Sequence, residues 1–149
     1  MCTAIMEDAS IEFVEGLLVA GVDPNRFSDG FLVGLENPAT ALMVAARQGK
    51  TAICILLVKH GADPDLWFDN ETDEAWMCPL ALAAMFGRID TLRMLIGADI
   101  GADYDATDPR DGSTAFHAAC DLGHVKRPAI HGTRLSGTRF KRLMQTVGL

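Results

Sequence analysis

The sequence predicts an all-α repeat solenoid of stacked helix-turn-helix units, and three observations predict it. Short apolar segments at helical spacing occur in pairs, which indicates helices that bury one face each. A Gly-x-Asp turn begins at Gly21, Gly61 and Gly101, so this marker recurs every 40 residues. The start of each first helix also recurs, at Thr40, Cys78 and Thr114. Self-similarity at such a period is typical of repeat proteins, in which each unit buries its apolar face only against its neighbours.

The best-formed unit covers residues 40–65, with the sequence TALMVAARQGKTAICILLVKHGADPD. Two apolar segments are separated by Gln48 and Gly49, and the second ends at Gly61 in a Gly-Ala-Asp-Pro turn. Each segment is too short to form a stable isolated helix. We therefore expect a helix, a tight turn and an antiparallel helix. The core-facing positions are Leu42, Ala45, Ala46, Ile53, Leu56 and Leu57.

The chain resembles the ankyrin repeat family, whose marks are T-P-L-H, a following small-residue pair, a Gly at the interhelix turn and a closing G-A-D. Thr40-Ala41-Leu42-Met43, Cys78-Pro79-Leu80-Ala81 and Thr114-Ala115-Phe116-His117 carry the first mark. The resemblance covers about residues 3–125, and no copy is complete. Only the third copy keeps the His, at His117, and only the second keeps the Pro, at Pro79.

The predicted repeats form one domain over residues 1–125, about three and a half units at 1–25, 40–65, 78–105 and, in part, 114–125. In the first unit the apolar pattern of residues 11–18 predicts the second helix and leaves room only for a clipped first helix, which we expect to cap the stack. The outer helix of the unit at 78–105, predicted from Ile89 to Ile96, ends in two Gly-Ala-Asp copies, at Gly97 and Gly101, and the sequence leaves open which one closes it. Pro128 ends the family pattern, because proline inside a helix costs about 3 kcal/mol.

Charge divides the chain into two parts. Residues 1–125 hold all 20 acidic side chains and 7 basic ones, a formal charge of −13, whereas residues 126–149 hold 6 basic side chains and no acidic one. The acidic body would repel nucleic acid and anionic lipid. No stretch is long and apolar enough to span a membrane, and the four scattered cysteines are typical of reduced core thiols. We therefore expect a cytoplasmic protein, with the nucleus as the other compartment.

The basic tail, residues 126–149, contains an apolar stripe at Phe140, Leu143, Met144 and Val147. This spacing predicts an amphipathic helix over about 138–147. We prefer the interpretation that it caps the uncovered face of the third repeat. The alternatives are a free basic helix that binds a partner, nucleic acid or an anionic surface, and a tail without a selected role.

The segments that join successive units are predicted to be β-hairpin-type fingers, and the first two are long. They run from Gly21 to Thr40 and from Gly61 to Cys78. Additional loop length costs little free energy, and insertions in repeat arrays gather on the face that binds. The long fingers are also aromatic, with Phe27 and Phe31 in the first and Trp67, Phe68 and Trp76 in the second.

No constellation for catalysis, metal or cofactor binding is predicted. His117, Cys120 and His124 have the spacing of metal ligands on a helix, but these are repeat positions and the family uses the histidines to hydrogen-bond turns. Two acidic fingers, over residues 63–74 and 99–111, lack the glycine and the oxygen spacing of a calcium loop, so we expect solvated acidic loops there. No nucleophile elbow, protease-type cysteine motif or phosphate-binding loop occurs. We expect a protein that is not an enzyme and that takes no cofactor.

The resemblance implies a protein-protein interaction module, because ankyrin-like arrays usually contact partners through finger tips and the two residues before each interhelix Gly, on the concave side. An apolar pair at Met85 and Phe86 beside aromatic fingers has the composition of a binding hot spot, although these aromatics could also serve only to pack the finger. We expect a monomer that binds a partner that is basic or has an exposed apolar segment. A regulatory or targeting domain of a larger enzyme complex is the other hypothesis. The candidate partner-binding residues are Phe27, Arg47, Gln48, Trp67, Phe68, Trp76, Met85, Phe86, Asp121 and Leu122.

Overall fold

The structure, a computed structural model, contains six helices in the residues that it describes. These residues are 1–28, 38–66, 78–97, 100–103, 105–106, 112, 114–115 and 117. The helices form three consecutive pairs along the chain. They are α1 (Cys2–Met6), α2 (Ile11–Val19), α3 (Ala41–Gln48), α4 (Thr51–Lys59), α5 (Pro79–Met85) and α6 (Ile89–Ile96).

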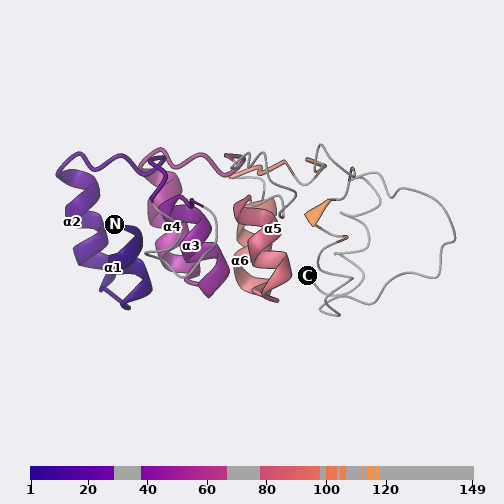
Figure 1. The fold of residues 1–149 in the computed structure, drawn as a ribbon, viewed down its shortest axis with the longest axis horizontal. Coiled ribbons are helices and arrows are strands. Elements are labelled where there is room, and N and C mark those ends of the chain that lie inside the picture. The colour runs from indigo at the N-terminus through magenta and orange to yellow at the C-terminus, as the bar shows by residue number, and fades with distance from the viewer. Residues whose placement is uncertain are drawn as a thin grey trace, which may run out of the picture.

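The three helix pairs lie side by side in a row (Figure 1). The first helices of the pairs form one layer, in which α3 packs against both α1 and α5. The second helices form another layer, in which α4 packs against both α2 and α6. This arrangement is the all-α solenoid that the sequence predicts, and the five-residue α1 is the short first helix expected for the first unit.

The first helix of each later unit begins at a residue that caps it with its side chain. Thr40 Oγ1 accepts a hydrogen bond from the Met43 amide at 3.3 Å, and Cys78 Sγ accepts one from the Ala81 amide at 3.3 Å. Pro79 occupies the first turn of α5, where its missing N–H is not needed. These caps satisfy amide groups that an α-helix leaves without an internal partner.

The core follows the first-helix layer, where small residues let the helices approach on both sides. In α3 all residues from Ala41 to Ala46 are buried, and in α5 all residues from Pro79 to Ala84 are buried. The second helices bury one face each, for example Ile53, Cys54 and Leu57 in α4. Burial on both sides explains why the apolar pattern of the first helices is nearly continuous rather than amphipathic.

The structure shows which Gly-Ala-Asp copy is equivalent to the earlier turns. Gly101 has φ +64°, in the left-handed region like Gly21 and Gly61, whereas Gly97 has φ −55°. The Ala102 amide donates to the Leu95 carbonyl at 3.1 Å, as the Ala62 amide donates to Leu57 at 2.9 Å. The second copy therefore closes the unit, and the two extra residues lie between α6 and Gly101.

The base of the first finger is a short antiparallel bridge. The Ser28 amide donates to the Ala39 carbonyl at 2.9 Å, and the Ala39 amide donates back to Ser28 at 3.2 Å. Residues 29–37 and 67–77 of the two long fingers lie outside the described residues. So do most of the partial unit 114–125 and the basic tail with its predicted helix over 138–147. No helix within the described ranges has the length and apolar character needed to cross a membrane.

Candidate functional site: the interhelix-turn surface

The carboxyl-terminal ends of α3 and α5 bring Arg47 and Phe86 into contact. The guanidinium carbon of Arg47 lies over the Phe86 ring, 4.9 Å from its centroid. This distance is within the range of a cation-π interaction, which orients the cation as well as stabilising it. Phe86 is 41% exposed, so a large part of its ring faces solvent. The two residues occupy consecutive repeats, and their contact therefore depends on the stacking of α3 against α5.

Arg88 completes this surface from the turn after α5. Its Nε donates to the Arg47 carbonyl at 2.9 Å. The Arg88 stem passes over Gly49, where a Cβ atom would lie only 2.8 Å from Arg88 Cδ. Gly49 also has φ +77°, so this position needs glycine for its backbone conformation and for the approach of Arg88. We call Arg47, Phe86 and Arg88 the interhelix-turn surface.

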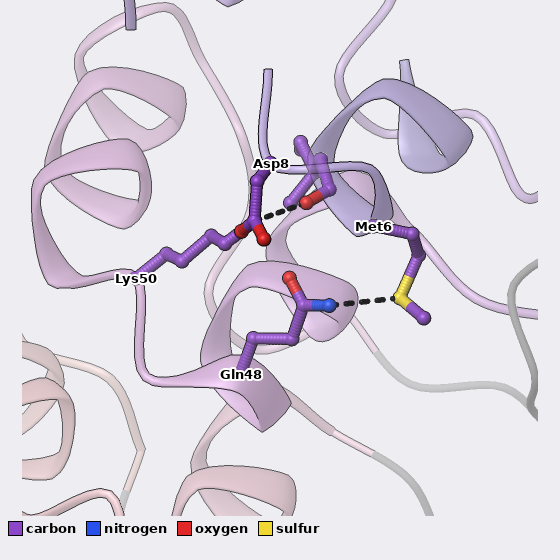
Figure 2. A network of polar contacts seen from close by, with 5 residues as sticks. Met6, Asp8, Gln48 and Lys50 are labelled. Carbon is purple, nitrogen blue, oxygen red and sulfur yellow. Dashed lines mark hydrogen bonds and ion pairs between the residues drawn. The ribbon is translucent and has the colours of Figure 1, made fainter. Parts of the chain in front are cut away.

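The polar contacts continue from this turn toward the first repeat (Figure 2). Lys50 Nζ forms an ion pair with Asp8 Oδ1 at 2.6 Å and also donates to the Ile5 carbonyl. Gln48 Nε2 donates to Met6 Sδ at 3.2 Å, while the buried Gln48 Oε1 has no hydrogen-bond partner. These contacts direct Gln48 and Lys50 toward the first repeat, and they fix the α1 turn against α3.

The opposite edge carries a row of acidic turns. In each turn an Asp side chain accepts a hydrogen bond from the amide two residues later, as Asp63 Oδ1 does from Asp65 at 2.9 Å. The same bond occurs from Asp23 to Asn25 and from Asp103 to Asp105, each at 2.9 Å. These are Asx turns, in which the side chain imitates a backbone turn.

A second set of bonds links each acidic turn to the next. The Asp63 amide donates to Asn25 Oδ1 at 2.8 Å, and the Asp103 amide donates to Asp65 Oδ1 at 2.7 Å. Asn25 Nδ2 also donates to the Gly61 carbonyl at 2.8 Å. We call these residues the Asx ladder. Several carboxylates of the predicted acidic fingers therefore have a structural role in joining repeats, which sequence reasoning did not identify.

The structure describes the surroundings of two helix cysteines, Cys54 and Cys78, and of His117. Burial raises the pKa of the Cys54 thiol to about 12 and that of the Cys78 thiol to about 11. Neither thiol is therefore activated as a nucleophile. His117 Nδ1 lies 3.1 Å from the Thr114 amide and 3.0 Å from Thr114 Oγ1, which is the turn hydrogen bonding expected for this family position. Within the described ranges, no cluster of His, Cys, Asp or Glu has a geometry that could hold a metal ion.

The structure brings together only part of the predicted binding set. Arg47 and Phe86 meet directly, and Met85 is a half-buried neighbour in the same turn. Phe27 is half-buried and packs against the core. Five further candidates lie outside the described residues, namely Trp67, Phe68, Trp76, Asp121 and Leu122. Sequence reasoning missed Arg88 and Lys50. The available signal was their register, since each directly follows a turn glycine.

Comparison with known proteins agrees with this geometry. Residues 1–108 match the family model described as ankyrin repeats (3 copies). The chain belongs to the ankyrin repeat family. Ankyrin repeats are protein-protein interaction modules, and the family is generally not enzymatic, so membership indicates a protein partner.

Two curated relatives are similar to this ankyrin chain over much of its length. Ankyrin repeat and SOCS box protein 3 of Bos taurus is 40% identical over 96 residues, which are 64% of this chain and 17% of the relative. Putative E3 ubiquitin-protein ligase XBAT31 of Arabidopsis thaliana is 35% identical over 86 residues, which are 58% of this chain and 17% of the relative. The matched region thus spans about a sixth of either relative.

Proposed function

We propose that this ankyrin chain binds a protein partner through its concave side, with the interhelix-turn surface at the centre of the contact. The observation that carries the proposal is the exposed Phe86 ring held under the Arg47 guanidinium at 4.9 Å. Aromatic and Arg side chains dominate the residues that carry binding energy in protein interfaces. Because Arg47 is already oriented, little conformational entropy remains to be lost when a partner binds.

The fingers are proposed to supply specificity. Trp67, Phe68 and Trp76 would provide apolar contact area, and the pair Asp121 and Leu122 would extend the same row of turns. Three acidic residues of the Asx ladder, Asp63, Asp65 and Asp103, are exposed to solvent. Their negative charge favours a basic segment of the partner at the finger edge. A partner that combines basic residues with an exposed apolar segment would use both features.

The proposal is tested by replacing Trp67 and Phe86 together with Ala in the full chain and repeating affinity capture with quantitative mass spectrometry. We expect the captured partner to be lost while the helical circular dichroism is unchanged. Val19, which is 74% exposed on α2, offers the matched control, since Val19→Ala removes apolar surface from another face. Retained capture by the double variant would remove this surface from consideration.

The relatives favour a second candidate role, that of the recognition part of a larger assembly. One relative is named as a putative E3 ubiquitin-protein ligase, and the matched region is only 17% of it. We propose that this ankyrin chain acts as the targeting unit of an enzyme complex. Recovery of a ubiquitin-transferring subunit with the wild-type chain would support this role, and its reproducible absence beside a captured partner would contradict it.

A cytoplasmic location is proposed with the same function. Cys2, Cys54 and Cys78 are free thiols and are buried, which suits a reducing compartment. Fractionation of cells that express the full chain, with antibody detection in each fraction, tests this location.

A further inference from the structure

We infer that the partner segment at the interhelix-turn surface carries a carboxylate next to an apolar side chain, so that an acidic side chain reaches Arg47 and Arg88 while its apolar neighbour covers Phe86. This inference rests on the proposed function and specifies the chemistry of the partner there. It differs from the expectation of a basic partner, which concerns the acidic finger edge.

The first observation is that neither arginine has an anionic partner among the described residues. Within the part of the chain that the structure describes, the two ion pairs are Lys50 with Asp8 and Arg93 with Asp90. Arg47 and Arg88 belong to neither pair. A guanidinium offers five N–H donors in a planar fork that matches a carboxylate. Arg88 uses its Nε on the Arg47 carbonyl, which leaves its two terminal nitrogens to bind another group.

The second observation is that both arginines are held in place before any partner binds. The guanidinium carbon of Arg47 is held over the Phe86 ring, 4.9 Å from its centroid. Arg88 is fixed by its hydrogen bond to the Arg47 carbonyl at 2.9 Å and by the passage of its stem over Gly49. Both arginines bring positive charge to the same interhelix-turn surface, which favours an anionic ligand there.

The third observation is the contrast with the rest of the chain. The formal net charge is −7, so general electrostatic attraction favours basic ligands. Both charged side chains of the interhelix-turn surface are cationic, whereas the other basic region of the chain is the tail of residues 126–149. Preference for an acidic segment at this surface would therefore oppose the overall field of the chain. Substitutions of Arg47 and Arg88 distinguish such a preference from attraction of acidic peptides to the basic tail.

The test is a selection of random twelve-residue peptides displayed on phage against the immobilised full chain. Parallel selections use the wild type, Phe86→Ala, the neutral pair Arg47→Gln with Arg88→Gln, and the reversed pair Arg47→Glu with Arg88→Glu. Circular dichroism and thermal unfolding verify the fold of each variant, and the pair Arg47→Lys with Arg88→Lys retains the charge if a neutral or reversed pair unfolds. Selected peptides are then synthesised and titrated at two salt concentrations.

We expect the wild type to enrich Asp or Glu beside Leu, Phe or Trp. The neutral pair should bind these peptides about tenfold or more weakly, and the reversed pair should enrich Lys or Arg at the same place. The inference would be overturned if the wild type enriched basic peptides, or if the reversed pair still enriched acidic ones. The proposed surface would remain supported in either case if Phe86→Ala still weakened peptide binding. Peptides that bind Phe86→Ala and the wild type equally would overturn the proposed function as well.

Discussion

The guanidinium of Arg47 lies over the ring of Phe86 at 4.9 Å, although the two side chains belong to different repeats. The contact depends on the packing of α3 against α5, which belong to different helix pairs. The binding surface that we propose is therefore a property of the stack. Changes that shift one repeat against the next should weaken binding even when each helix pair remains folded.

Gly49→Ala and Gly61→Ala form a matched pair that separates backbone strain from damage to the surface. Both glycines have positive φ, +77° and +89°, so Ala should cost about 1–2 kcal/mol of unfolding free energy at either position. Only at Gly49 would the new Cβ meet another side chain, at 2.8 Å from Arg88 Cδ, whereas nothing lies within 4 Å at Gly61. Urea unfolding should give similar losses, and peptide or partner binding should weaken only for Gly49→Ala. Equal weakening of binding by both variants would argue against a role for Arg88.

Asn25 and Asp65 occupy equivalent positions of the Asx ladder in successive turns. The ladder predicts that Asn25→Asp lowers the free energy of unfolding and that Asp65→Asn does not. Asn25→Asp removes the donor that binds the Gly61 carbonyl at 2.8 Å and places a negative charge against that oxygen. We expect a loss of about 0.5–1.5 kcal/mol, measured from the urea midpoint. The acceptor for the Asp63 amide would be kept, so the loss isolates the donor.

Asp65→Asn is the reciprocal variant. It keeps the acceptor for the Asp103 amide, removes one charge from the acidic row and adds a donor at the equivalent place in the next turn. Its stability should equal or exceed that of the wild type. A destabilisation as large as that of Asn25→Asp would contradict the ladder as the reason for either effect.

The buried thiols predict loss of stability at alkaline pH. Burial raises the pKa of Cys54 to about 12 and that of Cys78 to about 11, from an ordinary value of 9.0. Above pH 9 the unfolded thiols therefore ionise before the folded ones, so the unfolded state binds fewer protons and the unfolding free energy falls as pH rises toward 11 and 12. The variant Cys54→Ala with Cys78→Ser should lose less unfolding free energy than the wild type between pH 8.5 and pH 11.

Labelling with iodoacetamide gives an independent measurement of the same burial. At pH 8, Cys54 and Cys78 should be alkylated slowly in the folded chain and rapidly in urea, as followed for each cysteine by mass spectrometry. Rapid alkylation of either thiol under native conditions would contradict the buried positions assigned to them.

Much of the fold could be predicted because its determinants are local. The paired segments around Leu42 and Leu57, with Gly49 and Gly61 at the turns, specify helix pairs through spacing and turn chemistry alone. The choice between Gly97 and Gly101 was not predictable in this way, because both begin the same Gly-Ala-Asp sequence. The structure resolves it through contacts between distant residues, including the bond between the Asp103 amide and Asp65.

The interactions of the candidate site could not be predicted from the sequence. The resemblance to ankyrin repeats singled out Arg47 and Phe86 as candidate positions, and their role in binding stays a prediction. Their stacking, and the bond from Arg88 to the Arg47 carbonyl, depend on the distance and angle between repeats, which the sequence does not state. The sequence predicts solvated loops at the acidic turns. The bonds of the Asx ladder could not be predicted, because each one joins residues nearly one repeat apart in the sequence.

Photocrosslinking from position 86 tests the central claim most directly. Phe86 is replaced by p-benzoylphenylalanine in the full chain, which retains an aromatic ring at this exposed site, and Val19 is replaced in the same way as the control on α2. After capture and irradiation, we predict a covalent adduct between the chain and its protein partner from position 86 and none from position 19. An adduct from position 19 alone, or adducts of equal yield from both positions, would contradict the account.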